Sequence, residues 1–422
     1  MEITVRKARD VDFRVTAPPS KSYTHRAFIA AGLATGKSVI VNPLESVDCT
    51  ITRNALTEMG IRIEPGGRGY LVSGTDGRLR CRDSLVLDMA NSGTSLRLLA
   101  SVALLCPGTV TLTGSERMKE RPVAPLVEAL NSMGASIRYL EKKGCPPIAI
   151  GGSYGGGRVA VDGRISSQFI SSLLLAAPYA ARDTEIVLPG QPSSRSYIDI
   201  TIEVMEMFGA DVSRMEYNRF SVRSGKPYIG REYRIEGDYS SASYFFAIAA
   251  VCGGRVVVDN LNPDSCQGDR EFLSALEAMG AFVRYRRDAV MLEHDGVLEG
   301  IDIDMSSSPD TVQTLCMVAA FARSKTRITG IGHLRYKESD RLESIRQILS
   351  AMGTGVSVDE SGITIVPGRM RGATVDPGDD HRTAMSAAVL GLGAGDVTIM
   401  NAECVGKSYP GFWDALREAG LV

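Results

Sequence analysis

Basic residues recur at the start of segments whose composition is typical of buried helices. Lys21, Arg26, Arg97 and Arg382 each lie within a turn of an expected helix N-terminus, in polar clusters such as PPSKS and DDHR. A helix N-terminus carries about half a positive charge, so a cation there is unfavourable unless an anion is bound nearby. Serine, asparagine and aspartate in these clusters are also ordinary N-caps, but capping does not require cations. The pattern therefore predicts binding sites for anions such as phosphate or carboxylate.

Two further segments concentrate cations. Residues 117–122 read RMKERP and residues 336–341 read YKESDR, and each precedes a segment expected to form a surface helix. A solvated run of charge is the ordinary explanation for such a segment. The two segments occupy corresponding places in two copies of an internal repeat, which favours a shared role in holding a ligand. Together the clusters predict a ligand with more than one anionic group.

The internal repeat supplies the elements that position these cations. A polar helix-forming segment closes on a glycine and runs into a β-prone stretch six times, at intervals of about 67–75 residues. Within these segments apolar residues recur at helical spacing with charges between them, which predicts amphipathic surface helices. The glycines are Gly60, Gly134, Gly209, Gly280, Gly353 and Gly420.

A second set of segments, such as LRLLASVALL and YFFAIAAV, has no polar face. We expect these segments to form buried helices that run parallel within a domain and bring their N-termini to one end. A module of about 70 residues buries only about 60% of its unfolded surface, so three modules should pack into each of two domains. The sequence thus predicts an α/β protein in which two facing domains enclose a cleft of converging helix ends.

Composition excludes several classes of protein. The 422 residues carry a formal charge of −2 and 44% are hydrophobic, so no excess of positive charge is present for nucleic acid or anionic lipid. The N-terminus has no apolar signal core, and the longest apolar helices are expected to run about a dozen residues, short of the roughly 20 that span a bilayer. We expect a cytoplasmic protein with no membrane contact.

The spacing of the cysteines and histidines does not predict a metal site. The eight cysteines form no CxxC pair and are spread along the chain, and the four histidines are scattered. Buried free thiols are therefore expected in preference to a disulfide or zinc framework.

Seven motifs in register over essentially the whole chain resemble those of the 5-enolpyruvylshikimate-3-phosphate synthase family. No single motif would suffice, but seven in order are highly specific. They are Pro18-Pro19-Ser20-Lys21-Ser22 with Arg26, Asn91-Ser92-Gly93-Thr94 with Arg97, Arg117-Met118-Lys119-Glu120-Arg121-Pro122, Ser166-Ser167-Gln168, Lys337-Glu338-Ser339-Asp340-Arg341, Asp380-His381-Arg382 and Lys407-Ser408-Tyr409-Pro410.

This resemblance implies a particular fold and reaction. The fold is the two-domain enolpyruvyl transferase architecture, with six βαβαββ repeats, three per domain, around buried parallel helices and an active site in the interdomain cleft. One domain would comprise residues 1–15 and 238–422, and the other residues 16–237. The reaction transfers the enolpyruvyl group of phosphoenolpyruvate to the 5-hydroxyl of shikimate 3-phosphate, releases phosphate and needs no cofactor or metal. A monomer with these two small-molecule substrates and no nucleic acid partner is expected.

The resemblance also implies roles for individual residues. Asp310 would be the base on the attacking hydroxyl, and Glu338 and Lys21 would exchange protons at the enolpyruvyl carbons and the leaving phosphate. The expected contacts of shikimate 3-phosphate are Lys21, Ser22, Arg26, Ser166, Ser167, Gln168, Ser194, Tyr197, Asp310 and Lys337. Those of phosphoenolpyruvate are Lys21, Asn91, Gly93, Thr94, Arg121, Gln168, Arg341, Arg382 and Lys407.

Simpler explanations exist for two of these residues, and three positions depart from the family pattern. Asp310 could be an N-cap after a proline, and Glu338 an ion-pair partner of a nearby arginine. Ser196 and Leu98 stand where prolines are common, and His333 stands where an asparagine contacts the sugar phosphate.

Two other functions fit the sequence less well. A sister transferase acts on UDP-N-acetylglucosamine, but its reactive cysteine is missing from residues 117–122. A non-catalytic anion-binding or RNA-related repeat protein would gain nothing from carboxylates beside the anion, and the neutral overall charge does not favour RNA.

Overall fold

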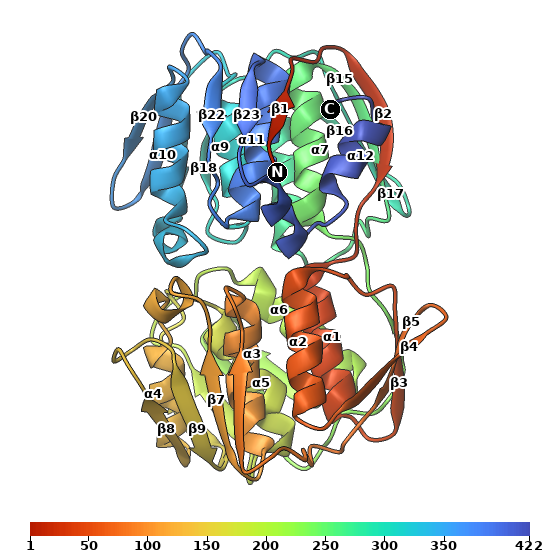
Figure 1. The fold of residues 1–422 in the computed structure, drawn as a ribbon, viewed down its shortest axis with the longest axis vertical. Helices are drawn as coiled ribbons and strands as arrows, with labels where there is room; N and C mark the ends of the chain where they lie inside the picture. Colours follow the sequence, from red (N-terminus) through yellow and green to blue (C-terminus); the bar gives the residue numbers. More distant parts are fainter. The chain divides into compact units, whose positions relative to one another are not determined.

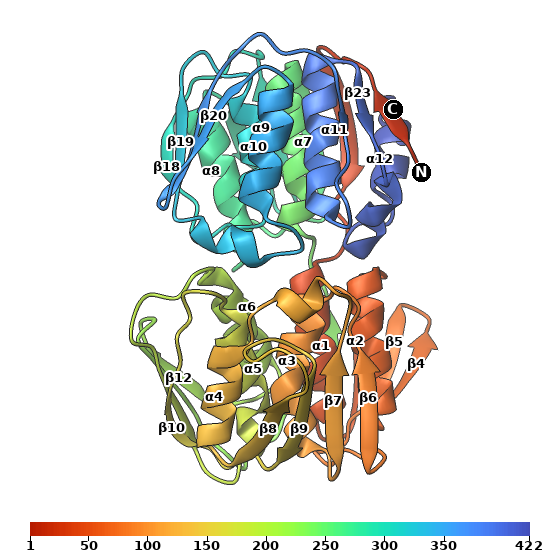
Figure 2. The ribbon, with the colours of Figure 1, turned by 60° about the vertical axis from the view of Figure 1, so that its left-hand side comes forward.

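The computed structural model describes all 422 residues. The chain divides into two compact units, here called unit 1 (Met1–Pro18 and Glu236–Val422) and unit 2 (Pro19–Ile235). Figures 1 and 2 show both units, with the chain passing twice between them. Each unit is a layered α/β structure built from three sheets around a central group of helices.

Unit 2 contains three four-stranded sheets, in the strand orders β14-β3-β5-β4, β6-β7-β9-β8 and β10-β11-β13-β12. Its elements in chain order are α1 (Lys21–Leu33), β3 (Lys37–Val41), α2 (Val47–Glu58), β4 (Arg62–Gly66), β5 (Gly69–Ser73), β6 (Ser84–Asp88), α3 (Gly93–Val102), η1 (Ala103–Leu105), β7 (Thr109–Thr113), η2 (Met118–Glu120), α4 (Ala124–Ser132), β8 (Ala135–Tyr139), β9 (Ile148–Gly152), β10 (Gly157–Ala160), α5 (Gln168–Ala176), η3 (Ala177–Tyr179), β11 (Thr184–Val187), α6 (Ser196–Met207), β12 (Val212–Met215), β13 (Arg219–Val222) and β14 (Glu232–Arg234).

Unit 1 contains two four-stranded sheets, β16-β17-β15-β2 and β18-β19-β21-β20, and the three-stranded sheet β1-β23-β22. Its elements are β1 (Ile3–Val5), β2 (Val11–Thr16), α7 (Tyr239–Cys252), β15 (Gly254–Asp259), η4 (Gly268–Arg270), α8 (Glu271–Ala278), β16 (Phe282–Tyr285), β17 (Ala289–His294), β18 (Asp302–Asp304), α9 (Val312–Ala319), β19 (Thr326–Thr329), η5 (Gly332–Tyr336), α10 (Arg341–Ala351), β20 (Gly355–Val358), β21 (Gly362–Val366), β22 (Ala373–Val375), α11 (His381–Ala394), β23 (Val397–Ile399), η6 (Ala402–Lys407) and α12 (Phe412–Glu418).

The sheets show the repeat directly. In β6-α3-β7-α4-β8-β9, strands β6 and β7 pair in parallel and β9 pairs antiparallel with both β7 and β8. Strand β2 pairs in parallel with β15 in unit 1, and β14 pairs in parallel with β3 in unit 2. In each unit, the strand next to a chain crossing thus pairs with a strand far from it in the sequence. The sixth repeat has no hairpin of its own, and β1 instead pairs antiparallel with β23.

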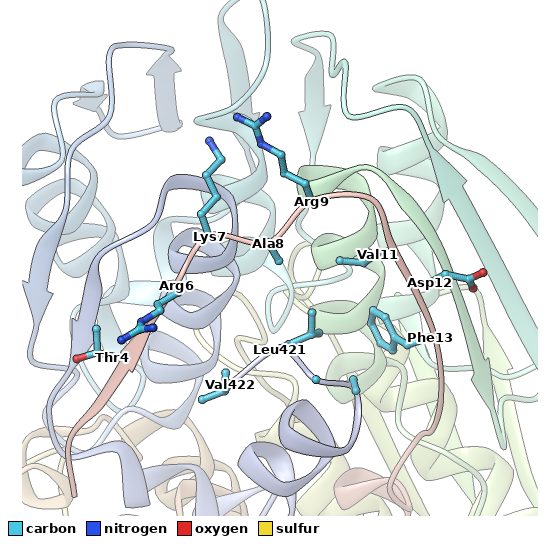
Figure 3. Close-up of a pocket in the computed structure, with 12 residues that line it drawn as sticks. Thr4, Arg6, Lys7, Ala8, Arg9, Val11, Asp12, Phe13, Leu421 and Val422 are labelled. Carbon is cyan, nitrogen blue, oxygen red and sulfur yellow. The ribbon is translucent and has the colours of Figure 1, made fainter.

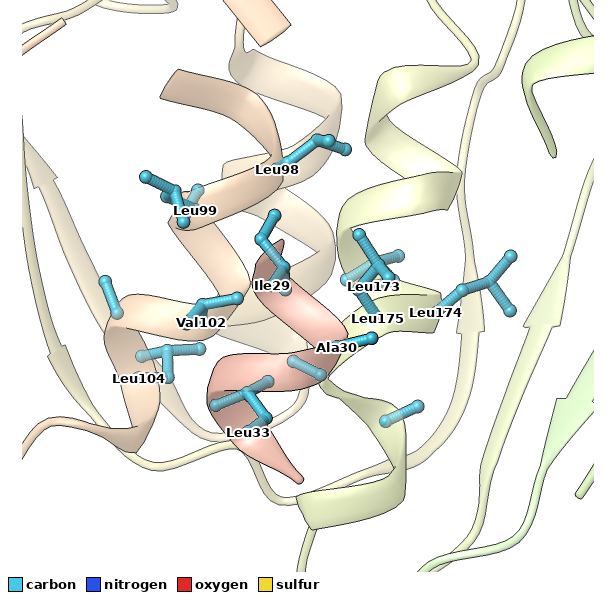
Figure 4. Close-up of a cluster of buried hydrophobic side chains, with 14 of the residues drawn as sticks. Ile29, Ala30, Leu33, Leu98, Leu99, Val102, Leu104, Leu173, Leu174 and Leu175 are labelled. Atoms are coloured by element: carbon cyan, nitrogen blue, oxygen red, sulfur yellow. The ribbon is translucent and has the colours of Figure 1, made fainter. Parts of the chain in front are cut away.

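The apolar helices are buried, as their sequences predict. All 14 residues of α7 are buried, and α1, α3, α5, α9 and α11 are buried along nearly their whole length. Figure 4 shows the result in unit 2, where Ile29 and Leu33 of α1 lie among leucines of α3 and α5. No helix combines the length and the apolar character that crossing a membrane requires.

The glycine-ended helices are also confirmed. Each of the six repeat glycines follows the last turn of a surface helix and has φ between 71° and 112°. Residues with a side chain rarely adopt such a φ, which is why glycine ends these helices. At Gly60 the chain turns so that Ile61 N donates to Leu56 O at 3.1 Å.

The prediction of free thiols is wrong for two cysteines. Cys81 and Cys106 form a disulfide, with Cα atoms 6.0 Å apart. Ser84 and Thr109 begin the parallel strands β6 and β7 and pair with each other, and each cysteine precedes its strand by three residues. Parallel pairing therefore brings the two cysteines side by side, which spacing along the chain could not reveal. Of the other cysteines, Cys49, Cys145, Cys252 and Cys316 are free and buried.

Candidate active site

In unit 2 the first turns of α1 hold a buried cation. Arg26 is 1% exposed and donates from Nε to Thr201 Oγ1 at 2.7 Å, from Nη1 to Ser22 O at 2.9 Å and from Nη2 to Tyr197 O at 3.0 Å. Burial lowers the pKa of Arg26 to about 10, so it remains charged at neutral pH. Because these acceptors are neutral, they fix the guanidinium in place without cancelling its charge, which suits it to an incoming anion.

Lys21 begins α1 and contacts a carboxylate that was not among the residues predicted for the site. Its Nζ lies 3.4 Å from Oδ2 of Asp48, in the first turn of α2. The Asp48 residue is 1% exposed, so the carboxylate directs and partly balances the ammonium group. An aspartate just after the N-cap Ser46 is an ordinary helix start, which is why no signal in the sequence pointed to Asp48.

At the start of α3, an arginine from a different segment lies against the helix end. Arg121 is 3% exposed, and its Nη1 donates to Asn91 O at 3.1 Å and to Asn91 Oδ1 at 3.3 Å. A Cβ atom added to Gly93 would come within 2.4 Å of Arg121 Nη2. The glycine is therefore needed for this close approach, and the helix N-terminus and the guanidinium form one positively charged surface.

The start of α5 is tied to α3. Gln168 accepts a hydrogen bond on Oε1 from Arg97 Nη1 at 2.9 Å and donates from Nε2 to Thr94 Oγ1 at 3.0 Å. Arg97 also donates to Pro122 O at 3.0 Å and is 4% exposed. Arg97 therefore orients Gln168, a role that the sequence did not assign to it.

The remaining predicted residues of unit 2 lie close to these helix starts in the chain. Ser166 and Ser167 directly precede α5 and are buried, and Ser166 Oγ accepts from Gln168 N at 3.3 Å. Ser194 precedes α6, is 4% exposed and has a φ of 57°. Tyr197 lies in the first turn of α6, and its carbonyl holds Arg26.

In unit 1, Asp310 lies between two arginines. Arg382 Nη2 donates to Asp310 Oδ2 at 2.6 Å, and Arg382 Nη1 donates to Asp310 O at 3.1 Å. Arg341 Nη1 donates to Asp310 Oδ1 at 3.3 Å. Asp310 directly precedes Thr311, the N-cap residue of α9. Its two ion pairs are contacts that N-capping alone would not require.

Arg341 connects three carboxylates. Its Nε donates to Asp380 Oδ2 at 2.9 Å and its Nη2 to Glu338 Oε2 at 2.8 Å, in addition to its bond with Asp310. Burial lowers the pKa of Arg341, but Asp380, Glu338 and Asp310 outweigh it and the pKa is raised above its usual value. Glu338 is therefore an ion-pair partner of Arg341, which was the simpler explanation for this residue. Through Arg341 it also belongs to the same cluster as Asp310.

Lys337, His333 and Lys407 complete the predicted residues of unit 1. His333 lies in η5 and is 8% exposed. Burial, with a smaller effect of Lys337, lowers the pKa of His333 to about 3, so its imidazole is neutral at physiological pH. Lys407 is 9% exposed and ends η6, which packs against α11.

Most of the predicted residues of each unit thus lie at or near the starts of its helices. Side-chain hydrogen bonds join α1 to α6 and α3 to α5 in unit 2, and join the starts of α9, α10 and α11 in unit 1. No group of three or more His, Cys, Asp or Glu residues is placed to hold a metal ion. Each unit presents buried cations, and unit 1 adds carboxylates able to accept protons.

A cavity of about 590 Å³ lies elsewhere in unit 1, between the β1–β2 connection and the C-terminal residues. Figure 3 shows Leu421 and Val422 on one side of it, while Lys7 and Arg9 point away from them. None of the predicted site residues lines this cavity, so it is not part of the candidate active site.

The chain is similar to proteins of one known family. The family model for EPSP synthase (3-phosphoshikimate 1-carboxyvinyltransferase) matches residues 5–416. Enzymes named 3-phosphoshikimate 1-carboxyvinyltransferase from Methanoculleus marisnigri and Methanosphaerula palustris are each 54% identical and are covered over 100% of both chains. A solved EPSP synthase structure from Acinetobacter baumannii has a TM-score of 0.83 at 29% identity and covers 100% of this chain and 98% of that one.

The fold is therefore that of the two-domain enolpyruvyl transferases. The chain belongs to the EPSP synthase family.

Proposed function

We propose that this protein transfers the enolpyruvyl group of phosphoenolpyruvate to the 5-hydroxyl of shikimate 3-phosphate and releases phosphate. This step belongs to the shikimate pathway of aromatic amino acid biosynthesis. The observation that carries the proposal is the family match over residues 5–416, which includes every charged residue of the candidate site. The two substrates together carry two phosphates and two carboxylates, which accounts for the supply of buried cations.

The reaction is an addition followed by an elimination. In the addition, the 5-hydroxyl oxygen bonds to C2 of phosphoenolpyruvate, its proton passes to a base, and a proton is added to the C3 methylene. In the elimination, the bond from C2 to the phosphate oxygen breaks and one proton leaves the methyl group, which restores the double bond. Both steps need positioned proton donors and acceptors.

Asp310 is the proposed base. Both of its carboxylate oxygens accept hydrogen bonds from arginines, yet each oxygen has a second lone pair with which to accept the hydroxyl proton. Its position is fixed through the cluster that Arg341 and Arg382 form, so the base would meet the hydroxyl in one orientation. Glu338 and Lys21 would carry the proton transfers at the enolpyruvyl carbons and the leaving phosphate.

The arginines are the proposed phosphoenolpyruvate ligands. Arg121, Arg341 and Arg382 are each less than 5% exposed and present planar guanidinium groups, which bind phosphate and carboxylate in a bidentate way. Lys21, Asn91, Gly93, Thr94, Gln168 and Lys407 complete the proposed set. Shikimate 3-phosphate would contact Lys21, Ser22, Arg26, Ser166, Ser167, Gln168, Ser194, Tyr197, Asp310 and Lys337.

Phosphate release is the direct test. Purified protein should release phosphate from phosphoenolpyruvate only when shikimate 3-phosphate is added. Release that is absent, or that appears instead with UDP-N-acetylglucosamine, would contradict the proposal. We also propose a monomer that works in the cytoplasm, which light scattering and cell fractionation would check.

A further inference from the structure

Asp269 is a buried carboxylate that none of the seven motifs contains. It lies in η4, directly before α8, and is 5% exposed. Its Oδ2 accepts a hydrogen bond from the hydroxyl of Ser240, in the first turn of α7. Burying a carboxylate is unfavourable unless neighbouring groups compensate its charge. The groups that surround Asp269 therefore indicate what it does.

These surrounding groups belong to the candidate active site. Asp310, before α9, and Arg382, in the first turn of α11, both act electrostatically on Asp269. The charged neighbours on its own segment have other contacts: Arg270 donates to a backbone carbonyl of the preceding loop, and Glu271 accepts from a serine hydroxyl. The two segments also meet directly, because Ser308, two residues before Asp310, donates from its hydroxyl to Gly268 O, next to Asp269.

Capping of α7 does not explain Asp269. Asp238, a further carboxylate that acts on Asp269, is the N-cap residue and accepts from Ser241 N at 2.7 Å. Gln267 Oε1 accepts from Tyr239 N at 3.0 Å. The neutral amide of an asparagine could also accept a hydrogen bond from the serine hydroxyl. The negative charge at this position needs another explanation.

Arg382 provides one, because its guanidinium lies near both carboxylates. Its Nη2 donates to Asp310 Oδ2 at 2.6 Å. Its Nη1 donates to Tyr244 Oη at 3.5 Å, one turn along α7 from Ser240, whose hydroxyl bonds Asp269. Arg341 is a second cation, 3.3 Å from Asp310 Oδ1. Two adjacent cations favour the charged form of a carboxylate and so make it a weaker base. General-base catalysis works best when the affinity of the base for protons matches the working pH.

We propose that Asp269 is a positioning residue that acts through Arg382 on Asp310. Its negative charge offsets part of the positive charge that Arg382 and Arg341 bring to Asp310, and it thereby keeps Asp310 basic enough to accept the proton of the attacking hydroxyl. This inference rests on the proposed function.

The titration of Asp269 predicts how kcat depends on pH. Burial, and next the charge of Asp310, raise the pKa of Asp269 to about 7. Its charge is therefore present above neutral pH and absent below it. As the pH rises through about 7, Asp269 becomes charged and offsets part of the positive charge around Asp310. The turnover number should rise over the same pH range.

The test compares kcat of the wild type and Asp269→Asn between pH 6 and 9, with saturating substrates. Asparagine has nearly the same shape and can keep the serine hydrogen bond, but it is neutral at every pH. We expect the ratio of wild-type to variant kcat to be close to 1 at pH 6 and to reach about 10 at pH 8.5. KM for both substrates should change by less than about threefold. Asp264→Asn removes a charge from an exposed position in the same loop and should leave kcat unchanged at every pH.

Two further variants keep the test decisive if Asp269→Asn folds poorly. The Ser240 hydroxyl stabilises the ionised form of Asp269 and so lowers its pKa. Ser240→Ala should therefore move the midpoint of the kcat profile to higher pH. Asp269→Glu keeps the charge and should restore the rise in kcat, in part or fully.

The outcomes distinguish a failure of the role proposed for Asp269 from a failure of the proposed function. An active wild type with a kcat ratio that does not depend on pH would show a merely structural role and overturn this inference alone. A Ser240→Ala midpoint that stays in place or moves to lower pH would do the same. A wild type without phosphate release that depends on shikimate 3-phosphate would overturn the proposed function, and this inference with it.

Discussion

Arg341 and Asp380 form an ion pair from which solvent is almost completely excluded. The Nε to Oδ2 distance is 2.9 Å, and the two side chains are 1% and 0% exposed. Asp380 is also the N-cap of α11 and accepts from the hydroxyl of Ser339. One carboxylate therefore fixes an arginine of the candidate site, a helix start and the segment before α10.

Removing this carboxylate should destabilise the protein and displace the arginine. In Asp380→Ala, Arg341 loses its most buried partner, and breaking a buried ion pair costs about 3–5 kcal/mol of unfolding free energy. Urea unfolding measures this loss. Asp379→Ala, at the exposed neighbouring position, is the matched control and should stay within about 0.5 kcal/mol of the wild type. Equal stability of the two variants would contradict the structural role of the pair.

Asp310→Asn should lower turnover while both substrates still bind. The amide has nearly the same shape but cannot accept the hydroxyl proton as a carboxylate does, and loss of a general base lowers kcat by about 10²- to 10⁴-fold. Steady-state kinetics together with calorimetric binding of each substrate would separate the two effects. Binding losses as large as the loss of kcat would place Asp310 among the binding residues instead.

Gly93→Ala should weaken phosphoenolpyruvate binding without unfolding the protein. The new Cβ would lie 2.4 Å from Arg121 Nη2, so the guanidinium would have to leave its position beside Asn91. We expect KM for phosphoenolpyruvate to rise about 10- to 100-fold, and KM for shikimate 3-phosphate to change little. Gly190→Ala, where a Cβ would meet no atom within 4 Å, serves as the control. An unchanged KM would show that Arg121 does not need its present position.

Arg121→Ala should act mainly on phosphoenolpyruvate as well. Loss of a charged hydrogen-bonding group is worth about 1.5–3 kcal/mol, or about 10- to 150-fold in affinity. The natural comparison is Arg117→Ala, four residues earlier, where the arginine pairs with Glu120 and is about a third exposed. Equal effects of Arg121→Ala on both substrates would argue against its assignment to phosphoenolpyruvate.

His333 should make the protein sensitive to acid. Burial lowers its pKa to about 3 in the folded state, against about 6.5 when unfolded, so the unfolded chain binds the extra proton between these values. The stabilising contribution is complete above pH 6.5 and is lost as the pH falls towards 3, by up to about 1.4 kcal/mol per pH unit. His333→Gln should show a smaller loss of stability between pH 7 and 5 in urea unfolding. An identical slope for wild type and variant would contradict this.

Much of the fold could be predicted because its signals are local. The six glycines lie at helix ends where φ is positive, and the apolar segments became buried helices because they lack a polar face. The disulfide could not be predicted, because Cys81 and Cys106 meet only through the parallel pairing of β6 and β7. The grouping of residues 1–15 with the second half of the chain came from the family resemblance, since nothing in the residues of β2 indicates that it pairs with β15.

The sequence alone determined which side chains stand at the helix starts, because helix ends and burial follow from spacing, capping and apolar pattern. Only the tertiary structure decided what those side chains do to one another. It placed Arg97 on Gln168, Asp48 on Lys21 and Arg382 on Asp310, pairs separated by 27 to 72 residues along the chain. Charge interactions depend on distance and burial, and neither is encoded at a single position. The anion-binding chemistry could therefore be predicted from the sequence, whereas the contacts that orient it, and the role proposed for Asp269, depend on how the helices pack.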